Sequence, residues 1–519
     1  MQGPTRARTG RRTARVLALL SVLVSLVAGC TTAGETQDSA KGSKNVVTIA
    51  AFSMGNSLDP WSSWISNYAV QAPYDTLTRQ LPDGEVAPWL ATSWKYTDSK
   101  TLVLKLRDDV DFTDGTHFTA ETVKANLDYG KTVNPKNQGD SAYLDSIKSV
   151  VVSGKYEVRI QLSQANPDLP WSFSRWAGWM VSTKALAHPK TLASTPVGSG
   201  PYILDAKATT NQQTYVFVKN PDYWAADKVE RFDKLTVRIM TDTTAMVNAA
   251  RAGKVDYLTL SDPSVGVAGM KKGYGGAVSI LGLVFQDLKG RISKPLKDVR
   301  VRQALNYAVN RKQLLDAVQQ GAGVVNGSVP YSSDSDGYSS ALDSHYTYDP
   351  AKAKALLKAA GYPNGFTVKA VINAQFARME QALAAQLAKV GVKVELSSHS
   401  SDIFQQTMSG KWAMATFVTN ITGQTYSDVV NSLTPSSIYN PQKNSDARIQ
   451  ELLAQATATT DAKQRETYYA ELAAYAQKQA WLLTPVLFKT AYSYNVDKIK
   501  IDAPSTVITP DLWYMSPAA

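Results

Sequence analysis

The chain reads EVAPWLATSWKYTDSKTLVLKLRDDVDFTDGTHFTAETVKANLDYG over residues 85–130, and this segment indicates its fold most clearly. Leucine stands at every second position over 102–106, which is the period-2 pattern of a strand with one buried face. An Asp-Gly pair follows at Gly115, and glycine can take the positive φ of a tight turn. Thr119 is then placed to cap a helix whose apolar residues recur four positions apart. Local chemistry alone therefore predicts a strand, a turn and a helix in succession.

The same residues carry a long pattern of fixed positions. They read P-x-L-A-x-S-W from Pro88, L-R-x-x-V-x-F-x-D-G from Leu106 and T-A-x-x-V from Thr119. This pattern resembles the signature of the family 5 extracellular solute-binding proteins, the peptide- and nickel-type receptors of ABC importers. A match of this length is far more specific than a short catalytic motif.

Further segments resemble the same family. They are L-D-P at 58–60, Y-D-T-L at 74–77, P-V-G-S-G-P-Y at 196–202, N-P-D-Y-W at 220–224 and P-L-K-D-V-R-V-R-Q-A-L at 295–305. The resemblance extends over residues 46–494. It implies an α/β protein with the two-lobed, type II fold of periplasmic binding proteins and an extra domain inserted in the first lobe, the arrangement called cluster C.

The resemblance also implies how the chain is divided. The implied parts are lobe I (46–74, 196–285 and 486–519), the inserted domain (75–195) and lobe II (286–485). Periodicity agrees with an α/β lobe II, because helices that begin after Asp298 and Asp349 alternate with a strand pattern at 392–396. We also expect the end of the chain, from residue 492, to pack back on lobe I.

The first 29 residues have the pattern of a lipoprotein signal peptide. Five arginines and no acid precede an apolar run at 16–28, which is shorter than the ~20 residues that span a bilayer. Val-Ala-Gly-Cys then ends at Cys30 and resembles the bacterial lipobox, so we expect Cys30 to become a lipidated N-terminus. Ordinary secretion, with Cys30 as a free thiol, is the alternative. Residues 30–45 lack hydrophobic periodicity and predict a flexible tether that holds the protein at the extracellular face of the bacterial cell membrane.

Composition and charge narrow the classes of function. The formal net charge of +11 falls to +6 without the leader, which predicts a mildly basic surface and no nucleic-acid partner. Cys30 is the only cysteine, and the four histidines show no metal-ligand spacing. No G-x-S-x-G nucleophile motif occurs. We therefore expect a binding protein without catalytic groups or cofactors.

The partners follow from the resemblance. It implies a monomeric receptor that gives its small-molecule ligand to the permease subunits of an ABC importer. An extracellular hydrolase and a ligand-sensing surface receptor without transport are the alternatives from other classes.

The resemblance implies a solute cleft between the lobes, lined by aromatic side chains and a few polar anchors. Candidate residues follow from their positions at the end of the first strand, near the crossover between the lobes, in lobe II and in the return strand. They are Phe52, Met54, Asn56, Phe285, Gln286, Arg378, Trp412, Phe417, Asn420, Tyr426 and Phe488. Core packing is the alternative for each aromatic residue, and a solvated helix face is the alternative for Arg378.

One expected residue is missing. Peptide-binding members of the family place an aspartate after the Trp-containing strand of lobe II, where it pairs with the ammonium of the peptide. Residues 412–420 contain no acid, and Asp428 is the nearest one. A buried ammonium without a counter-charge is costly, so we expect unmodified di- and tripeptides to bind poorly unless Asp428 folds back into the cleft. A peptide, a modified peptide, an opine, a sugar or a metal chelate are the ligands left open.

Overall fold

The computed structural model describes residues 45–51, 57–62, 68–133, 144–227, 231–260, 262–400, 402–459, 461–503 and 507–518. The predicted lipidation site Cys30 and the predicted ligand residues Phe52, Met54 and Asn56 lie outside the described residues. In the described part of the chain, no helix is both long and apolar enough to cross a membrane.

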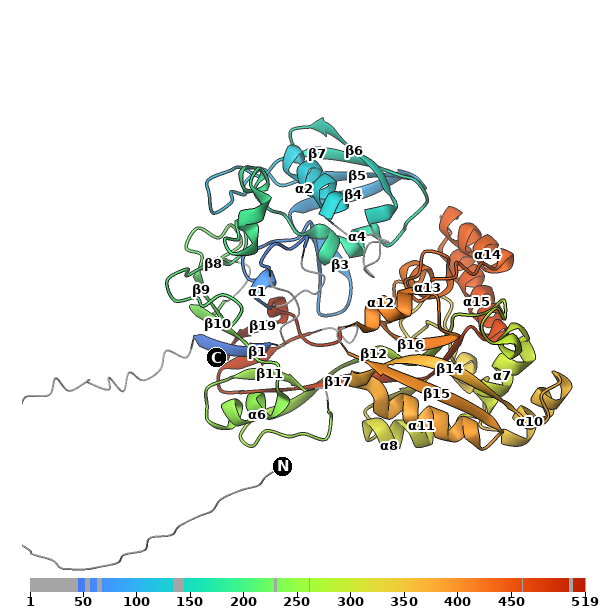
Figure 1. Cartoon of the computed structure of the whole chain (residues 1–519). Coiled ribbons are helices and arrows are strands. Elements are labelled where there is room, and N and C mark those ends of the chain that lie inside the picture. Colours follow the sequence, from blue (N-terminus) through green and yellow to red (C-terminus); the bar gives the residue numbers. More distant parts are fainter. Residues whose placement is uncertain are drawn as a thin grey trace, which may run out of the picture. The chain divides into compact units, whose positions relative to one another are not determined.

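An eleven-stranded sheet organises the described residues (Figure 1). Its strands, in order, are β15 (Val392–His399), β14 (Phe366–Asn373), β16 (Met414–Asn420), β12 (Lys271–Phe285), β17 (Leu482–Tyr494), β11 (Tyr257–Leu260), β1 (Val46–Ala51), β10 (Lys234–Ile239), β9 (Thr214–Lys219) and β8 (Tyr202–Leu204), with β13 (Gly323–Val325) beside β17. Parallel pairs such as β14–β15 and β1–β10 stand beside antiparallel ones.

Two long strands, β12 and β17, belong to both halves of this sheet. The end of β12 pairs with β16, and the end of β17 pairs with β11. Between these two regions, the β12–β17 register shifts on either side of Ala277. The half with β14, β15 and β16 is lobe II, and the half with β1, β9 and β10 is lobe I. The predicted two-lobed α/β fold is confirmed, and β12 and β17 run from one lobe into the other.

Helices cover the sheet of lobe II. They are α7 (Val299–Tyr307), α8 (Arg311–Gln319), α9 (Ser340–Ser344), α10 (Pro350–Ala359), α11 (Ala377–Ala388), α12 (Ile403–Met408), α13 (Thr425–Leu433), α14 (Ala447–Ala458) and α15 (Ala462–Gln479). Two of these helices begin where the sequence predicted, because the side chains of Asp298 and Asp349 accept backbone N–H bonds at their first turns. Asp446 and Asp461 cap α14 and α15 in the same way.

A second, four-stranded sheet belongs to the inserted region, which is cyan in Figure 1. Its order is β4 (Ala91–Asp98), β5 (Thr101–Leu106), β7 (Glu157–Leu162) and β6 (Ile147–Gly154), and α2 (Ala120–Val133) packs against it. The strand, turn and helix predicted from residues 85–130 are all present. Gly115 has φ of +78°, as the turn requires. Short elements beside it are β2 (Thr78–Gln80), β3 (Val86–Pro88), α4 (Leu169–Ser172) and α5 (Thr183–Leu186).

The end of the chain packs on lobe I, as predicted. β18 (Ile499–Ile501) and β19 (Met515–Pro517) form a separate pair. Segments far apart in sequence are joined here, because the side chain of Gln71, in α1 (Tyr68–Gln71), bonds both Asp511 and Leu512. A further helix, α6 (Thr243–Arg251), covers lobe I beside β11.

The family motifs meet at one buried carboxylate, Asp75. Its Oδ1 accepts bonds from Trp89 Nε1 (2.8 Å) and Tyr223 OH (3.1 Å). Its Oδ2 accepts bonds from Ser199 Oγ (2.9 Å) and Trp224 Nε1 (2.9 Å). These five residues come from four separate motifs of the sequence. Because no donor is local in sequence to Asp75, the network fastens the inserted region to lobe I.

Candidate functional site

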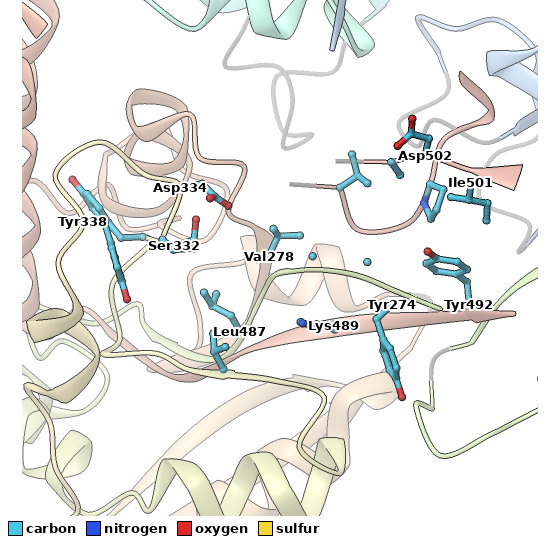
Figure 2. A pocket seen from close by; sticks show the side chains of 18 of the residues that line it. Tyr274, Val278, Ser332, Asp334, Tyr338, Leu487, Lys489, Tyr492, Ile501 and Asp502 are labelled. Carbon is cyan, nitrogen blue, oxygen red and sulfur yellow. The ribbon is translucent and has the colours of Figure 1, made fainter. Parts of the chain in front are cut away.

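A cavity of about 620 Å³ lies beside the strands that join the lobes (Figure 2). This volume falls in the range of small-molecule sites, roughly 300–1,000 Å³. Its lining comes from lobe I, lobe II and the end of the chain. The lining residues are Tyr274, Gly275, Gly276, Val278, Val324, Tyr331, Ser332, Ser333, Asp334, Tyr338, Asp343, Leu487, Lys489, Tyr492, Ile501, Asp502, Ala503, Val507 and Pro510.

One wall is fixed by a close approach of the C-terminal segment to β12. The N–H of Gly276 donates to the carbonyl of Val507 at 2.9 Å. A Cβ at Gly275 would stand only 1.8 Å from the carbonyl oxygen of Ile508. Glycine is required at position 275 for this reason, and the sequence Gly275-Gly276 thereby positions Val507 and Ile508.

The opposite wall, residues 326–338, is held by a buried arginine of α8. The guanidinium of Arg311 donates to the carbonyl of Asn326 (2.9 Å), to Ser328 Oγ (3.2 Å) and to Asn306 Oδ1 (3.0 Å). Asn326 in turn bonds the carbonyl of Tyr331, which lines the cavity. Burial lowers the pKa of Arg311 to about 10. Residues of α7 and α8 therefore hold the wall of the cavity in place without lining the cavity themselves.

Charged side chains of both signs line the cavity. Lys489 extends from β17 and is half-buried, whereas Asp334 and Asp502 are exposed on either side of it in Figure 2. Among the described residues, none of these three side chains has an ion-pair or hydrogen-bond partner. Asp343 differs, because it accepts a 2.5 Å bond from Tyr338 and burial raises its pKa. The cavity thus offers one ammonium and two carboxylates to a solute.

Of the predicted ligand residues, the eight that the structure describes all lie outside this lining. Phe285 and Phe417 are buried in the core of lobe II, with 2% and 0% of their surfaces exposed. Gln286 is also buried, and its amide donates to the carbonyls of Thr407 and Tyr439. Core packing and hydrogen bonds within lobe II surround these three residues.

The other predicted residues are held by neighbouring protein groups. Arg378 is exposed and donates to the carbonyl of Ala317, and Asn420 accepts from Ser279. Trp412 lies edge-on to His399, Tyr426 accepts from Gln164, and Phe488 packs near Phe376.

Phe488 lies on β17 between two residues that line the cavity. Side chains of a strand alternate between two faces, and the lining includes Leu487 and Lys489 but not Phe488. The sequence signal for these residues is a lysine in an otherwise uncharged return strand, together with acids in the polar segment that contains Asp334.

Asp428 does not supply the missing acid of the cavity. It is 3% exposed, and its carboxylate accepts bonds from the backbone N–H (3.0 Å) and the hydroxyl (3.1 Å) of Thr422. Burial raises its pKa well above the ordinary value. Asp334 and Asp502, from two other segments, are carboxylates of the lining without such bonds among the described residues, beside the hydrogen-bonded Asp343.

The family model for bacterial extracellular solute-binding proteins, family 5, matches residues 85–445. The chain belongs to this family. This family 5 protein is 30% identical over 488 residues to the glutathione-binding protein GsiB of Pectobacterium atrosepticum, which covers 89% of this chain and 91% of that one.

Solved structures show the same fold. DppA from Helicobacter pylori in complex with the peptide STSA has a TM-score of 0.74 and 22% identity, covering 91% of this chain and 98% of that one. AgaA from Agrobacterium tumefaciens R10 in complex with agropinic acid has a TM-score of 0.76 and 23% identity, covering 91% and 99%. The type II periplasmic-binding-protein fold is therefore confirmed.

Family membership makes the chain a substrate-binding protein of ABC transport rather than an enzyme, as predicted. The hydrolase alternative is dropped on the same ground.

Two histidines of the described residues pair with aspartates. His117 pairs with Asp111 at 2.6 Å, and His399 pairs with Asp402 at 3.0 Å. Within the described ranges, no group of three or more His, Cys, Asp or Glu side chains could hold a metal ion.

Proposed function

We propose that this family 5 protein captures a small peptide or peptide-like solute that carries both a carboxylate and a cationic group. The solute occupies the cavity beside β12 and β17, and the protein delivers it to the permease of an ABC importer. The observation that carries the proposal is the lining of that cavity, where Lys489 faces the space together with Asp334 and Asp502. A zwitterionic solute matches both signs of charge.

Apolar contact and charge both contribute to the binding free energy that this proposal requires. Burying about 300 Å² of apolar solute surface contributes about 7 kcal/mol, and micromolar binding requires about 8 kcal/mol. Aromatic and aliphatic residues such as Tyr492 and Leu487 supply apolar surface. A carboxylate bonded to Lys489 closes the remaining gap, because a hydrogen bond to a charged group contributes about 1.5–3 kcal/mol.

The cavity changes the expectation for free-amine peptides. That expectation rested on the lack of an acid in residues 412–420, but Asp334 and Asp502 come from elsewhere in the chain. Glutathione and a tetrapeptide are bound by relatives of this protein, and both molecules carry an ammonium and at least one carboxylate. We therefore place them before a sugar, which would leave Lys489 without a counter-charge.

A binding screen tests the proposal. Thermal-shift measurements compare glutathione, free-amine tripeptides, their N-acetylated and C-amidated forms, an oligosaccharide and a nickel–histidine chelate, and calorimetry follows on each hit. Zwitterionic members are expected to bind, with blocked forms weaker. Preferential binding of the uncharged oligosaccharide would contradict the proposal. Adjacent genes for a permease and an ATPase would favour transport over a receptor that only signals.

We also propose that Cys30 is lipidated and that the protein is held at the extracellular face of the cell membrane. The lipobox-like sequence before Cys30 supports this. The mature protein is expected to partition into a detergent phase, and Cys30→Ala is expected to release it or to block its processing. Unchanged mass and membrane association in Cys30→Ala would rule lipidation out.

A further inference from the structure

A carboxylate of the inserted region caps a helix of lobe II. Asp168 lies between β7 and α4, and its Oδ2 accepts bonds from the backbone N–H (2.9 Å) and the hydroxyl (2.8 Å) of Ser427. Both residues are buried, with 8% and 2% of their surfaces exposed. Ser427 is the third residue of α13, whose own preceding residue, Gln424, makes no side-chain capping bond among the described residues. Asp168 therefore caps α13 from a distant part of the same chain, whereas a capping aspartate usually precedes the helix directly.

A second bond joins the same two elements. Gln164 Nε2 donates to the hydroxyl of Tyr426 at 3.0 Å. The loop that carries Gln164 and Asp168 is fixed to the inserted region, because Tyr96 bonds the carbonyl of Asn166 at 2.5 Å. The contact is thus made by a rigid loop rather than by a single long side chain.

Polar bonds carry much of this contact. A second cavity, of about 570 Å³, lies beside it and is lined by Lys100 and Gln164 of the inserted region and by residues of α13 and α14. Space of this size means that the two surfaces are not packed together there. The bonds at Asp168 and Gln164 are therefore separable from the hydrophobic cores on either side.

The first turn of α13 also touches the wall of the solute cavity. Thr425 Oγ1 donates to the carbonyl of Asp336 at 3.4 Å. At Gly423, the loop before α13 lies so near Asp334 that an added Cβ would be 3.1 Å from its carbonyl oxygen. A movement of α13 relative to lobe II would therefore disturb the wall that carries Asp334.

We propose that Asp168 and Ser427 form a latch that holds the inserted region on lobe II and sets how long the lobes stay closed around a solute. This inference rests on the proposed function, because closure matters only if a solute is held. Asp168 is a positioning residue here, since it contacts α13 and does not line the solute cavity.

The latch is tested by the distance between the inserted region and lobe II, without any added solute. Fluorescent labels at Lys148→Cys and Lys354→Cys, in a Cys30→Ser background, report that distance by single-molecule energy transfer. Asp168→Ala is expected to reduce the ratio of closed to open molecules by roughly tenfold to a hundredfold, the range for hydrogen bonds to a charged group.

Two variants complete the comparison. Ser427→Ala keeps the backbone N–H and is expected to shift the ratio in the same direction but less. Asp108→Ala, an exposed aspartate of the inserted region, is the matched control and is expected to leave the ratio unchanged.

Equal distance distributions in wild type, Asp168→Ala and Ser427→Ala would overturn the latch. Ser427→Ala decides the question if Asp168→Ala does not fold. The energy-transfer measurement contains no solute. If the ratio of closed to open molecules changes as expected but no solute binds in the screen, the proposed function is rejected and the latch is retained.

Discussion

Replacing Asp75 by alanine should destabilise the protein strongly, although Asp75 is remote from the solute cavity. The substitution removes one acceptor group and leaves four donors: two indole N–H groups and two hydroxyls. Hydroxyls can turn towards other acceptors, whereas the indole N–H groups of Trp89 and Trp224 cannot. Each buried donor left unsatisfied costs about 1–3 kcal/mol.

The expected magnitude combines this loss with a partial relief. Burial raises the pKa of Asp75, because removal from water disfavours the charged carboxylate. Replacement by alanine relieves this desolvation cost. Two orphaned indoles cost about 2–6 kcal/mol, and relief of that desolvation brings the net loss into the lower half of this range. Asp75→Asn retains one acceptor oxygen but turns an amide NH₂ towards two other donors, so we expect it to be nearly as destabilising.

Urea unfolding followed by tryptophan fluorescence measures the change in the free energy of unfolding. Asp222→Ala, an exposed aspartate from the same N-P-D-Y-W motif, is the matched control and is expected to change the free energy of unfolding by less than ~0.5 kcal/mol. An Asp75→Ala variant as stable as this control would refute the reasoning.

Two further substitutions probe lobe II. Burial raises the pKa of Glu380 to about 7, and Thr416 is its hydrogen-bond partner. The native state therefore binds the proton more tightly than the unfolded state, so stability falls as pH rises from about 4.5 to about 7. Glu380→Gln should remove this pH dependence and be more stable than wild type by up to ~3 kcal/mol at pH 8. Thermal unfolding of both proteins at pH 4.5 and pH 8 measures the difference, and equal pH dependence would contradict the prediction. Arg311→Met should cost about 3 kcal/mol and expose residues 326–338 to protease, because it leaves buried carbonyls unpaired. The exposed Arg378→Met serves as its control, and equal proteolysis of the two would contradict this account.

The sequence predicted the fold well because the signals were local. A capping aspartate such as Asp349, or the alternation before Gly115, acts within a few residues of the element that it determines. The motifs shared with the family proved to be structural: Asp75 gathers four of them, and Arg302 of the motif at 295–305 donates to the carbonyls of Leu296 and Gln479. Similarity of motifs therefore located the fold but not the ligand.

The site was harder to predict because it depends on register and on distant segments. Whether Phe488 or Lys489 faces the cavity follows from how β17 pairs with β12, including its shifts near Ala277. Asp334 and Asp502 are 168 positions apart in the sequence, and only the folded chain brings them to one space. No periodic pattern records that meeting.

Calorimetry on Lys489→Met tests the central claim most directly. Methionine keeps most of the length of the side chain and removes its charge, and Lys500→Met, at an exposed lysine on β18, is the matched control. For the tightest-binding zwitterionic peptide of the screen, Lys489→Met is expected to raise Kd about tenfold to a hundredfold, while the C-amidated form of the same peptide loses little. An unchanged Kd in Lys489→Met for the free-carboxylate peptide would contradict the assignment of this cavity and its lysine to solute binding.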